Sequence, residues 1–215
     1  MSLREATAEN HKNAEKQPFV GIMFGGKLPD EVYAIYLWNL YLQYETLETF
    51  AHEAGVLNTD ELAELYRAPK IKEDYKELWH RPTNPPTLQT TLDFKKHLQG
   101  ISDDPKALMA HCYTRHMGDL SGGQMLKARV PGSARMYEFE NTDELKGKIR
   151  EKLSDDLEDE VKIAYDFATK MFAEMLMYLP PELHKPAAAP PVNKANSERP
   201  ADGEVSWEPE EEEEE

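Results

Sequence analysis

The 215-residue chain carries a formal net charge of −16, and 31% of its residues are charged while 40% are hydrophobic. That composition is typical of a soluble globular domain, and no apolar run approaches the roughly 18 residues that a membrane span needs. The acidic balance argues against nonspecific binding to nucleic acid or to anionic membranes. Cys112 is the single cysteine, so an intrachain disulfide is excluded and we expect a reducing, cytoplasmic compartment.

Helical signals begin at the N-terminus. Ser2 and Glu5 fit a capping box, in which two residues three positions apart satisfy free backbone N–H groups at a helix start. We expect this helix to stop before Pro18, because proline disfavours helical conformation in the preceding residue. A second helix opens at 29–31 and continues to Gly55, with apolar residues at roughly helical spacing: Ile35, Trp38, Leu42 and Leu47.

The rest of the folded region also reads as helix. Shorter helices follow within 58–80, and "HRPTNPPT" is a loop because it contains three prolines. Two further helices are expected at about 87–99 and 104–129, then the connector "PGSARMYEFEN", then a long helix or broken pair over about 142–179. Strand signals are nearly absent. The sequence therefore predicts one all-α domain over residues 1–180.

The C-terminal segment has a different composition. From Lys185 onward Pro, Ala, Ser and Glu dominate, and nine acidic side chains follow Arg199. Such a segment cannot bury enough apolar surface to offset the entropy of ordering it. We therefore predict that residues 181–215 form a disordered acidic tail.

A histidine and a glutamate on the first predicted helix form the first candidate functional pair. His11 and Glu15 are four residues apart and so share a helix face, and Arg4 lies on the same side. An imidazole can bind a metal through one nitrogen while the other donates to a carboxylate, which fixes the ring orientation. An ordinary solvated surface pair has the same spacing.

The stretch "YTRHMGDLSGGQ", residues 113–124, places three glycines in a predicted helix. Gly118 and Gly122 are four apart and would share a face, which leaves a bare backbone strip beside a flat ligand or a neighbouring helix. Asp119 lies within that strip and is either a surface ion-pair partner of Arg115 or a carboxylate that orders water beside a ligand.

Lys146 and Arg150 place two cations on one face of a late helix. They are either solvated or bind the carboxylates of an anionic ligand, which Arg can hold bidentately. An axial base, a flat glycine surface and a set of cations together suit haem, which is planar and carries two propionates.

These residues resemble the haem oxygenase family. "HKNAE" (11–15) is similar to the family's proximal segment, and "AHCYTRHMGDLSGGQMLK" (110–127) to its distal-helix signature. The last helices are similar more loosely, and the resemblance spans roughly residues 1–179. It implies a single-domain helical bundle that holds haem between a proximal helix and a kinked distal helix.

The resemblance also implies roles for individual residues. His11 would be the axial iron ligand, and Glu15 the partner of its other nitrogen. Asp119 would hold a water near iron-bound oxygen, in a network supported by Arg115 and Tyr44.

The same resemblance assigns the glycines and the propionate anchors. Gly118 and Gly122 would let the distal helix pass close above the haem, and Gly123 would keep that helix kinked. The propionates would be held by four residues from three segments: Arg4, Tyr113, Lys146 and Arg150.

The family reaction is oxidative cleavage of haem, both substrate and cofactor, to biliverdin, with the IXα isomer expected, Fe²⁺ and carbon monoxide. It consumes O₂ and electrons. Because the sequence has no flavin or nucleotide motif, the electrons are expected from a separate protein, ferredoxin, as in soluble bacterial, plastid and phage members. The resemblance further implies a monomer, a downstream bilin reductase as a partner, and a cytoplasmic location, which is the host cytoplasm if a phage encodes the chain.

Three positions depart from the family pattern. Ala8 stands where a second cation often precedes the proximal histidine, His116-Met117 replaces Tyr-Leu, and Ala168 replaces a polar asparagine. We expect His116 to serve in packing or hydrogen bonding. These departures concern the outer part of the water network.

Two other function classes remain open from the sequence. A non-catalytic haem carrier would keep the pocket without turnover. A di-iron or thiamin-type relative would share the helical fold, but a di-iron site needs several inward carboxylates and Glu-x-x-His pairs, which the expected pocket helices lack.

Overall fold

The computed structural model describes residues 2–57 and 60–183. Helix α1 (Leu3–Glu15) begins at the predicted capping box: the Ser2 hydroxyl accepts a hydrogen bond from the Glu5 N–H, and the Ser2 N–H donates to Glu5 Oε2 at 2.8 Å. Pro18 occupies the first turn of a short helix, α2 (Pro18–Phe24), which is not among the helices predicted from the sequence. Proline fits there because the first helical N–H groups have no partner within the helix.

Helix α3 (Asp30–Glu53) is the longest element and follows its predicted bounds. It lies at the centre of the fold and packs against α4 (Ala68–Leu78), α5 (Gln89–Gly100) and α6 (Pro105–Leu120). A 3-10 segment, η1 (Asp60–Leu65), leads into α4. This position explains why α3 buries residues on nearly every side.

The second half of the chain contains two breaks. The helix expected over 104–129 is divided into α6 and α7 (Gly122–Leu126), and the last helical region is a pair, α8 (Thr142–Glu151) and α9 (Glu158–Met175). Short 3-10 turns fill the connections: η2 (Arg135–Tyr137), η3 (Asp155–Leu157), η4 (Leu176–Tyr178) and η5 (Pro181–Leu183). The remainder of the predicted acidic tail lies outside the described residues.

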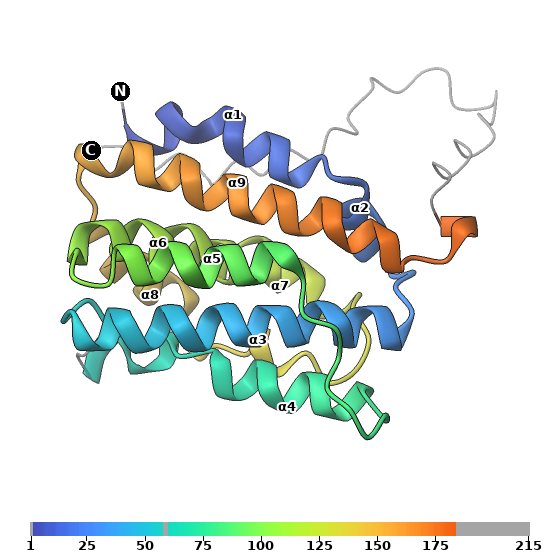
Figure 1. The fold of residues 1–215 in the computed structure, drawn as a ribbon. Helices are drawn as coiled ribbons and strands as arrows, with labels where there is room; N and C mark the ends of the chain where they lie inside the picture. The colour runs from blue at the N-terminus through green and yellow to red at the C-terminus, as the bar shows by residue number, and fades with distance from the viewer. Residues whose placement is uncertain (1, 58–59, 184–215) are drawn as a thin grey trace, which may run out of the picture.

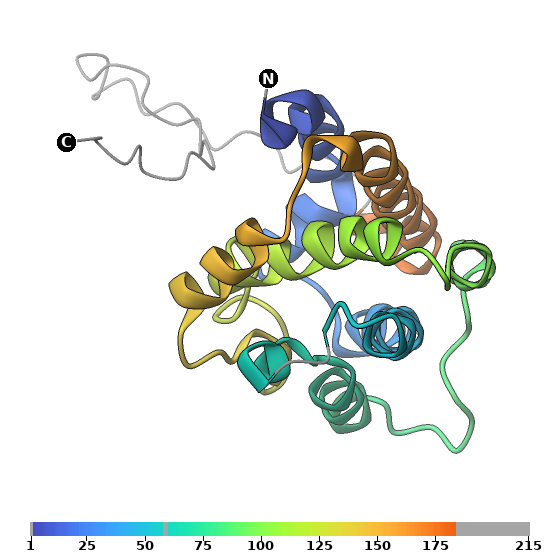
Figure 2. The same ribbon diagram turned by 90° about the vertical axis from the view of Figure 1, so that its left-hand side faces the viewer.

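The helices form stacked layers. In Figure 1, α1 lies along α9, and the contacts of α6 with both α9 and α3 place it between the outer and the central layers. Figure 2 shows the same order end-on, with α4 on the far side of α3 from α6. The part of the chain that the structure describes contains helices and turns but no strand, so the predicted all-α class is confirmed.

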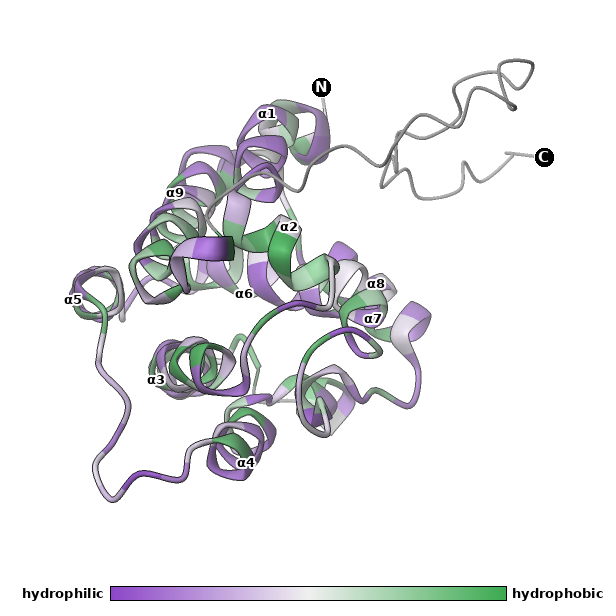
Figure 3. Ribbon diagram, turned by 90° about the vertical axis from the view of Figure 1, so that its right-hand side faces the viewer, coloured by the Kyte–Doolittle hydropathy of each residue, from purple (hydrophilic) through white to green (hydrophobic). Residues whose placement is uncertain are grey.

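Apolar side chains form two buried clusters along the bundle. One gathers around α2, α3, α4 and the end of α9, and the other joins α5, α6, α8 and the start of α9. In Figure 3 the helices carry both hydrophobic residues, drawn green, and hydrophilic residues, drawn purple. None of the described helices is long and apolar enough to cross a membrane.

Candidate functional site

His11 lies on the inward face of α1 but is not buried. Leu3, Thr7 and Ala14 share its helical stripe and are all buried, whereas 46% of the His11 side chain is exposed. Residues at spacings of three and four occupy one helix face, so His11 extends the buried stripe of α1 to the protein surface. A half-exposed imidazole in that position is accessible to a ligand.

Glu15 orients this imidazole. His11 Nδ1 lies 3.3 Å from Glu15 Oε2, and the ring makes an edge contact with Tyr165 of α9, with centroids 5.5 Å apart. Burial raises the pKa of Glu15, and the nearby His11 acts in the opposite direction. With Nδ1 directed at the carboxylate, Nε2 is the nitrogen left to bind a metal, as the sequence pair predicted.

The helix break at Ser121 corrects one expectation. Because Ser121 has φ −112° and ψ −89°, Gly122 opens α7 and does not continue the face of Gly118 on α6. Gln124 stabilises this break: its side-chain amide donates to the carbonyl of Asp119 at 3.0 Å and to that of Tyr137 at 3.1 Å. A helix end must satisfy its free carbonyls, and Gln124 serves that purpose here.

Gly118 and Gly123 have different surroundings. A Cβ added at Gly118 would meet no atom within 4 Å, and the residue is exposed. A Cβ at Gly123 would lie 2.6 Å from Cδ1 of the buried Tyr137 ring. Gly118 therefore leaves an open surface on α6, whereas Gly123 permits α7 to pack closely on η2.

We expect opposite effects from substituting these two glycines. Gly123→Ala should lower the free energy of unfolding by about 1–3 kcal/mol, because the added methyl group overpacks Tyr137. Gly118→Ala should leave stability equal or slightly higher, since alanine favours helix by up to about 1 kcal/mol. Chemical unfolding of the haem-free proteins measures both, and equal destabilisation would contradict the assignment.

Asp119 is a buried carboxylate held by a tyrosine. It is 7% exposed, and its Oδ2 accepts a hydrogen bond of 2.7 Å from the hydroxyl of Tyr44 on α3. Burial raises the pKa of Asp119 to about 6, although the Tyr44 hydrogen bond and the charges of His116, Arg67 and Arg115 oppose the rise. A carboxyl group with that pKa exchanges protons near neutral pH, which suits a proton-handling role.

Arg115 is positioned by a residue that the sequence did not single out. In place of the ion pair with Asp119 that the spacing allowed, its guanidinium donates to Gln43 Oε1 and lies over the rings of Phe94 and Tyr44, at 4.6 and 5.6 Å from their centroids. Gln43 also donates to Thr91 at 2.8 Å. Arg115 thus influences Asp119 through its charge rather than through a direct contact.

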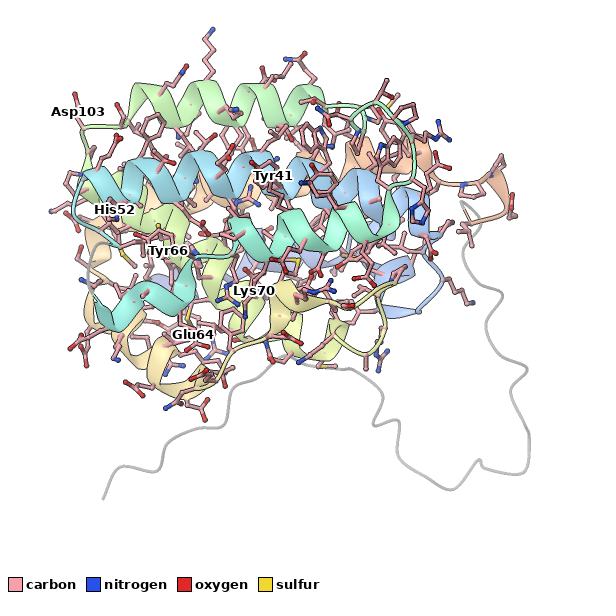
Figure 4. All side chains as sticks on the ribbon, turned by 90° about the horizontal axis from the view of Figure 1, so that it is seen from below. Tyr41, His52, Glu64, Tyr66, Lys70 and Asp103 are labelled. Atoms are coloured by element: carbon pink, nitrogen blue, oxygen red, sulfur yellow. The ribbon has the colours of Figure 1, made fainter. Side chains whose placement is uncertain are left out.

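A second buried polar group lies behind Tyr44. Glu48 accepts hydrogen bonds from the backbone N–H groups of Arg67 and Ala68, and the Arg67 guanidinium donates to the carbonyl of Glu138 at 2.7 Å. Figure 4 shows Glu64, Tyr66 and Lys70, the sequence neighbours of Arg67, on the α4 side of the molecule. Because Glu48 and Arg67 lie far from Asp119 in the sequence, no local pattern predicted this network.

His116, one of the departures from the family pattern, belongs to this buried group. Its Nδ1 lies 2.9 Å from the carbonyl of Cys112, so Nδ1 carries the hydrogen, and Nε2 lies 3.9 Å from Glu48 Oε1. The imidazole makes an edge contact with the Tyr44 ring, with centroids 5.6 Å apart. The other two departures, Ala8 on α1 and Ala168 on α9, are exposed and half-buried.

The four expected propionate anchors come from three helices. Arg4 on α1 and Arg150 on α8 are exposed, and both are near enough to Tyr113 on α6 for their charges to oppose the rise that burial causes in its pKa. Lys146 Nζ lies 3.6 Å from Asp143 Oδ1. Arg4, Tyr113 and Arg150 are therefore brought together, while Lys146 contacts an acidic neighbour on its own helix.

The residues present fit haem. His11 presents a half-exposed imidazole on α1, Gly118 presents bare backbone on α6, and the charges of Arg4 and Arg150 act on Tyr113. Arg4, His11 and Glu15 share α1, so the candidate axial base and one candidate anchor lie on the same helix. These residues are the candidate site for a planar, anionic, metal-bearing ligand in an all-α protein.

Comparisons with known proteins identify the family. The heme oxygenase family model matches residues 1–174. "Heme oxygenase" of Guillardia theta is 29% identical over 205 residues, covering 82% of this chain and 86% of the relative. "Heme oxygenase 2" of Synechocystis sp. is 32% identical over 148 residues, covering 65% of this chain and 58% of the relative. The chain belongs to the haem oxygenase family, and the predicted resemblance is confirmed.

Solved structures agree on the fold. The heme oxygenase of Leptospira interrogans superposes with a TM-score of 0.71 at 28% identity and covers 81% of this chain and all of its own. Heme oxygenase-1 of Synechocystis, solved in complex with heme, gives a TM-score of 0.71 at 23% identity over 82% of this chain and 91% of its own. The expected helical bundle is therefore the fold of these heme oxygenases.

Proposed function

We propose that this protein cleaves haem oxidatively to biliverdin, Fe²⁺ and carbon monoxide, with O₂ as co-substrate and haem as both substrate and cofactor. The IXα isomer is the proposed product. Family membership and the fold support the proposal. Two observations carry it: a half-exposed His11 imidazole beside Glu15 on α1 and, on α6, a buried Asp119 carboxyl whose pKa burial raises to about 6.

The protein contributes binding, orientation and proton handling. Bound haem supplies the oxygen-activating chemistry through its iron. His11 would hold the iron on one side, and the bare backbone at Gly118 would let α6 lie close on the other. Arg4, Tyr113 and Arg150, with Lys146, would fix the rotation of the ring in its plane.

Asp119 would deliver protons on the α6 side. Its Oδ2 accepts from Tyr44, so the second oxygen remains to hold a water molecule facing the ligand. Arg115, held by Gln43 above the Tyr44 ring, adds positive charge that favours the ionised carboxylate. A group that both accepts and releases a proton near pH 6 suits repeated proton transfers in one reaction cycle.

Electrons would come from ferredoxin. Lys12 and Lys16 are exposed on α1 beside His11, and cations near the haem edge suit a small acidic donor. A cytoplasmic monomer that passes biliverdin to a bilin reductase completes the proposal. High salt should therefore raise the Michaelis constant for ferredoxin more than it lowers haem affinity.

Anaerobic reconstitution followed by turnover tests the proposal. The protein is loaded with haem, then given ferredoxin, its reductase, NADPH and air, and the pigment is separated by chromatography. Biliverdin IXα with release of carbon monoxide is expected. A haem absorption band without any pigment would favour the carrier, and the absence of a haem band would favour the di-iron or thiamin-type class.

The propionate anchors give a second prediction. Replacing Lys146 and Arg150 together with alanine should weaken haem binding and yield other biliverdin isomers, because each charge-assisted bond contributes roughly 1.5–3 kcal/mol. Since Lys146 already contacts Asp143, Arg150→Ala alone should cause most of the change. A single unchanged isomer in the double variant would show that steric packing sets the cleavage position.

A further inference from the structure

Three metal-ligating side chains from three helices converge outside the site described above. His97 Nε2 on α5 lies 2.5 Å from Glu160 Oε1 on α9, and His111 Nε2 on α6 lies 2.8 Å from the same oxygen. The ligand atoms of all three lie within 4.8 Å of one another. Within residues 2–57 and 60–183, this is the one group of three or more such side chains close enough to share an ion.

The group is polar inside an aromatic shell. His111 is fully buried, whereas His97 and Glu160 are 24% and 19% exposed. Phe94 makes an edge contact with His111 at 5.3 Å between centroids, and Phe167 lies 5.4 Å from His97. An apolar surround limits solvent at a metal site and strengthens the attraction between a cation and its ligands.

The site has an entrance. His97 lines an open surface hollow together with Asp93, Lys96, Gly100 and Ile101. Figure 4 shows Asp103, which belongs to the short turn joining α5 to α6, at one end of the bundle. An ion can therefore reach the group from the His97 side, and a water molecule can occupy a remaining coordination position there.

We propose that His97, His111 and Glu160 bind one divalent transition-metal ion of the Zn²⁺ type. Two imidazoles and one carboxylate form a common three-ligand set for zinc, with water in the fourth position. Bonds of about 2.0–2.2 Å at tetrahedral angles place the ligand atoms roughly 3.3–3.5 Å apart, so His97 and Glu160 withdraw slightly from their present separation. Both are partly exposed and free to do so.

Metal binding and hydrogen bonding are distinct states of this group. Without metal, both Nε2–H groups donate to the Glu160 carboxylate. On metal binding the Nε2 proton of each imidazole moves to Nδ1 through solvent exchange, and Nε2 gives its lone pair to the ion. No redox change accompanies this step.

The ion would join α9 to α5 and α6, which are themselves connected by a short turn. α6 carries Asp119 eight residues beyond His111, and α9 packs against α1, which carries His11. A bond network between α5, α6 and α9 therefore supports both sides of the candidate haem site. An ion that binds only the folded state raises the free energy of unfolding. The increase grows with the logarithm of the ratio of ion concentration to dissociation constant.

Cobalt substitution tests the proposal. The full haem-free chain, stripped of metal with a chelator, is titrated with Co²⁺ at pH 7.5. One equivalent should produce a saturable visible d–d absorption, and Zn²⁺ should displace it. Zn²⁺ should also raise the melting temperature of both the haem-free and the haem-loaded protein.

Matched variants decide which residues are responsible. His97→Ala and Glu160→Gln should each weaken Co²⁺ binding by more than the roughly 10–100-fold that loss of an outer-shell partner costs. His11→Ala and the exposed His80→Ala should retain the absorption. No saturable absorption in the wild type, or equal affinity in His97→Ala, would overturn the proposal and leave the group as a hydrogen-bonded clamp. If Glu160→Gln fails to fold, the partly exposed His97→Ala still decides.

Discussion

We expect His11→Ala to lower the affinity for haem more than any other single substitution at the site and to stop turnover. The variant loses the one imidazole on α1, while the fold should be kept because the side chain is 46% exposed. Loss of an outer-shell partner typically costs roughly 10–100-fold in metal affinity, and loss of the ligand itself should exceed that. Haem titration followed by absorption measures the change, and added imidazole should restore part of it.

Two controls accompany this measurement. Glu15→Gln removes the charge beside Nδ1 but keeps a hydrogen-bonding group, so its loss of affinity should fall within the 10–100-fold range. His52→Ala removes an exposed histidine that contacts Tyr66 at the other side of the bundle and should leave affinity unchanged. An unaltered haem spectrum in His11→Ala would show that another residue is the ligand.

Asp119→Ala should leave haem bound but reduce biliverdin formation by at least about a hundredfold. In the proposed site haem would be held through His11 on a different helix, whereas the buried Asp119 carboxyl would be the proton-handling group on the α6 side. General acid–base groups contribute typically 10²–10⁴-fold to rate. Asp119→Asn, which still accepts from Tyr44, should be only partly better. Near-normal pigment yield from Asp119→Ala would mean that backbone groups order the water.

The same carboxyl makes a separate prediction for stability. Burial raises the pKa of Asp119 to about 6, above the usual 3.9 of an unfolded aspartate. The folded state then holds the proton more tightly, so stability falls as pH rises from about 4 to 6 and stays lower above that range. At pH 8 the buried, ionised carboxylate lowers the free energy of unfolding by about 3 kcal/mol relative to acidic pH, because one pKa unit corresponds to about 1.4 kcal/mol. At pH 8 the haem-free Asp119→Asn variant should therefore have a higher urea concentration at its unfolding midpoint than the wild type. Near pH 4 the two midpoints should be equal.

The sequence predicts the elements whose signals are local. The Ser2–Glu5 capping box, the stop before Pro18 and the His11–Glu15 pair each depend on residues within one turn, and the structure contains all three. Gly118, Gly122 and Gly123 are also a local signal, because closely spaced glycines disfavour a regular helix and so indicate irregular backbone. Helical spacing alone was therefore sufficient to place His11 beside Glu15, whereas their roles as axial base and partner come from the family resemblance and stay predictions.

Other features depend on side-chain contacts that the helical pattern does not encode. The break at Ser121 is held by Gln124 hydrogen bonds to Asp119 and Tyr137, and for that reason the single helix expected over 104–129 was wrong. Arg115 prefers Gln43, 72 positions earlier, to the carboxylate four positions later. The pattern of apolar residues encodes neither the Gln124 hydrogen bonds nor the long-range contact of Arg115 with Gln43, so only the packed bundle reveals them.

The outer position of α1 has a consequence for how the ligand enters and leaves. Among the described helices α1 packs mainly on α9, and three of its thirteen residues are buried. Helices with few buried contacts open at lower free energy than the global unfolding of the protein. Amide hydrogens of α1 should therefore exchange with deuterium before those of α3, and haem should slow that exchange. The observed haem affinity then equals the intrinsic affinity multiplied by the fraction of molecules with α1 docked.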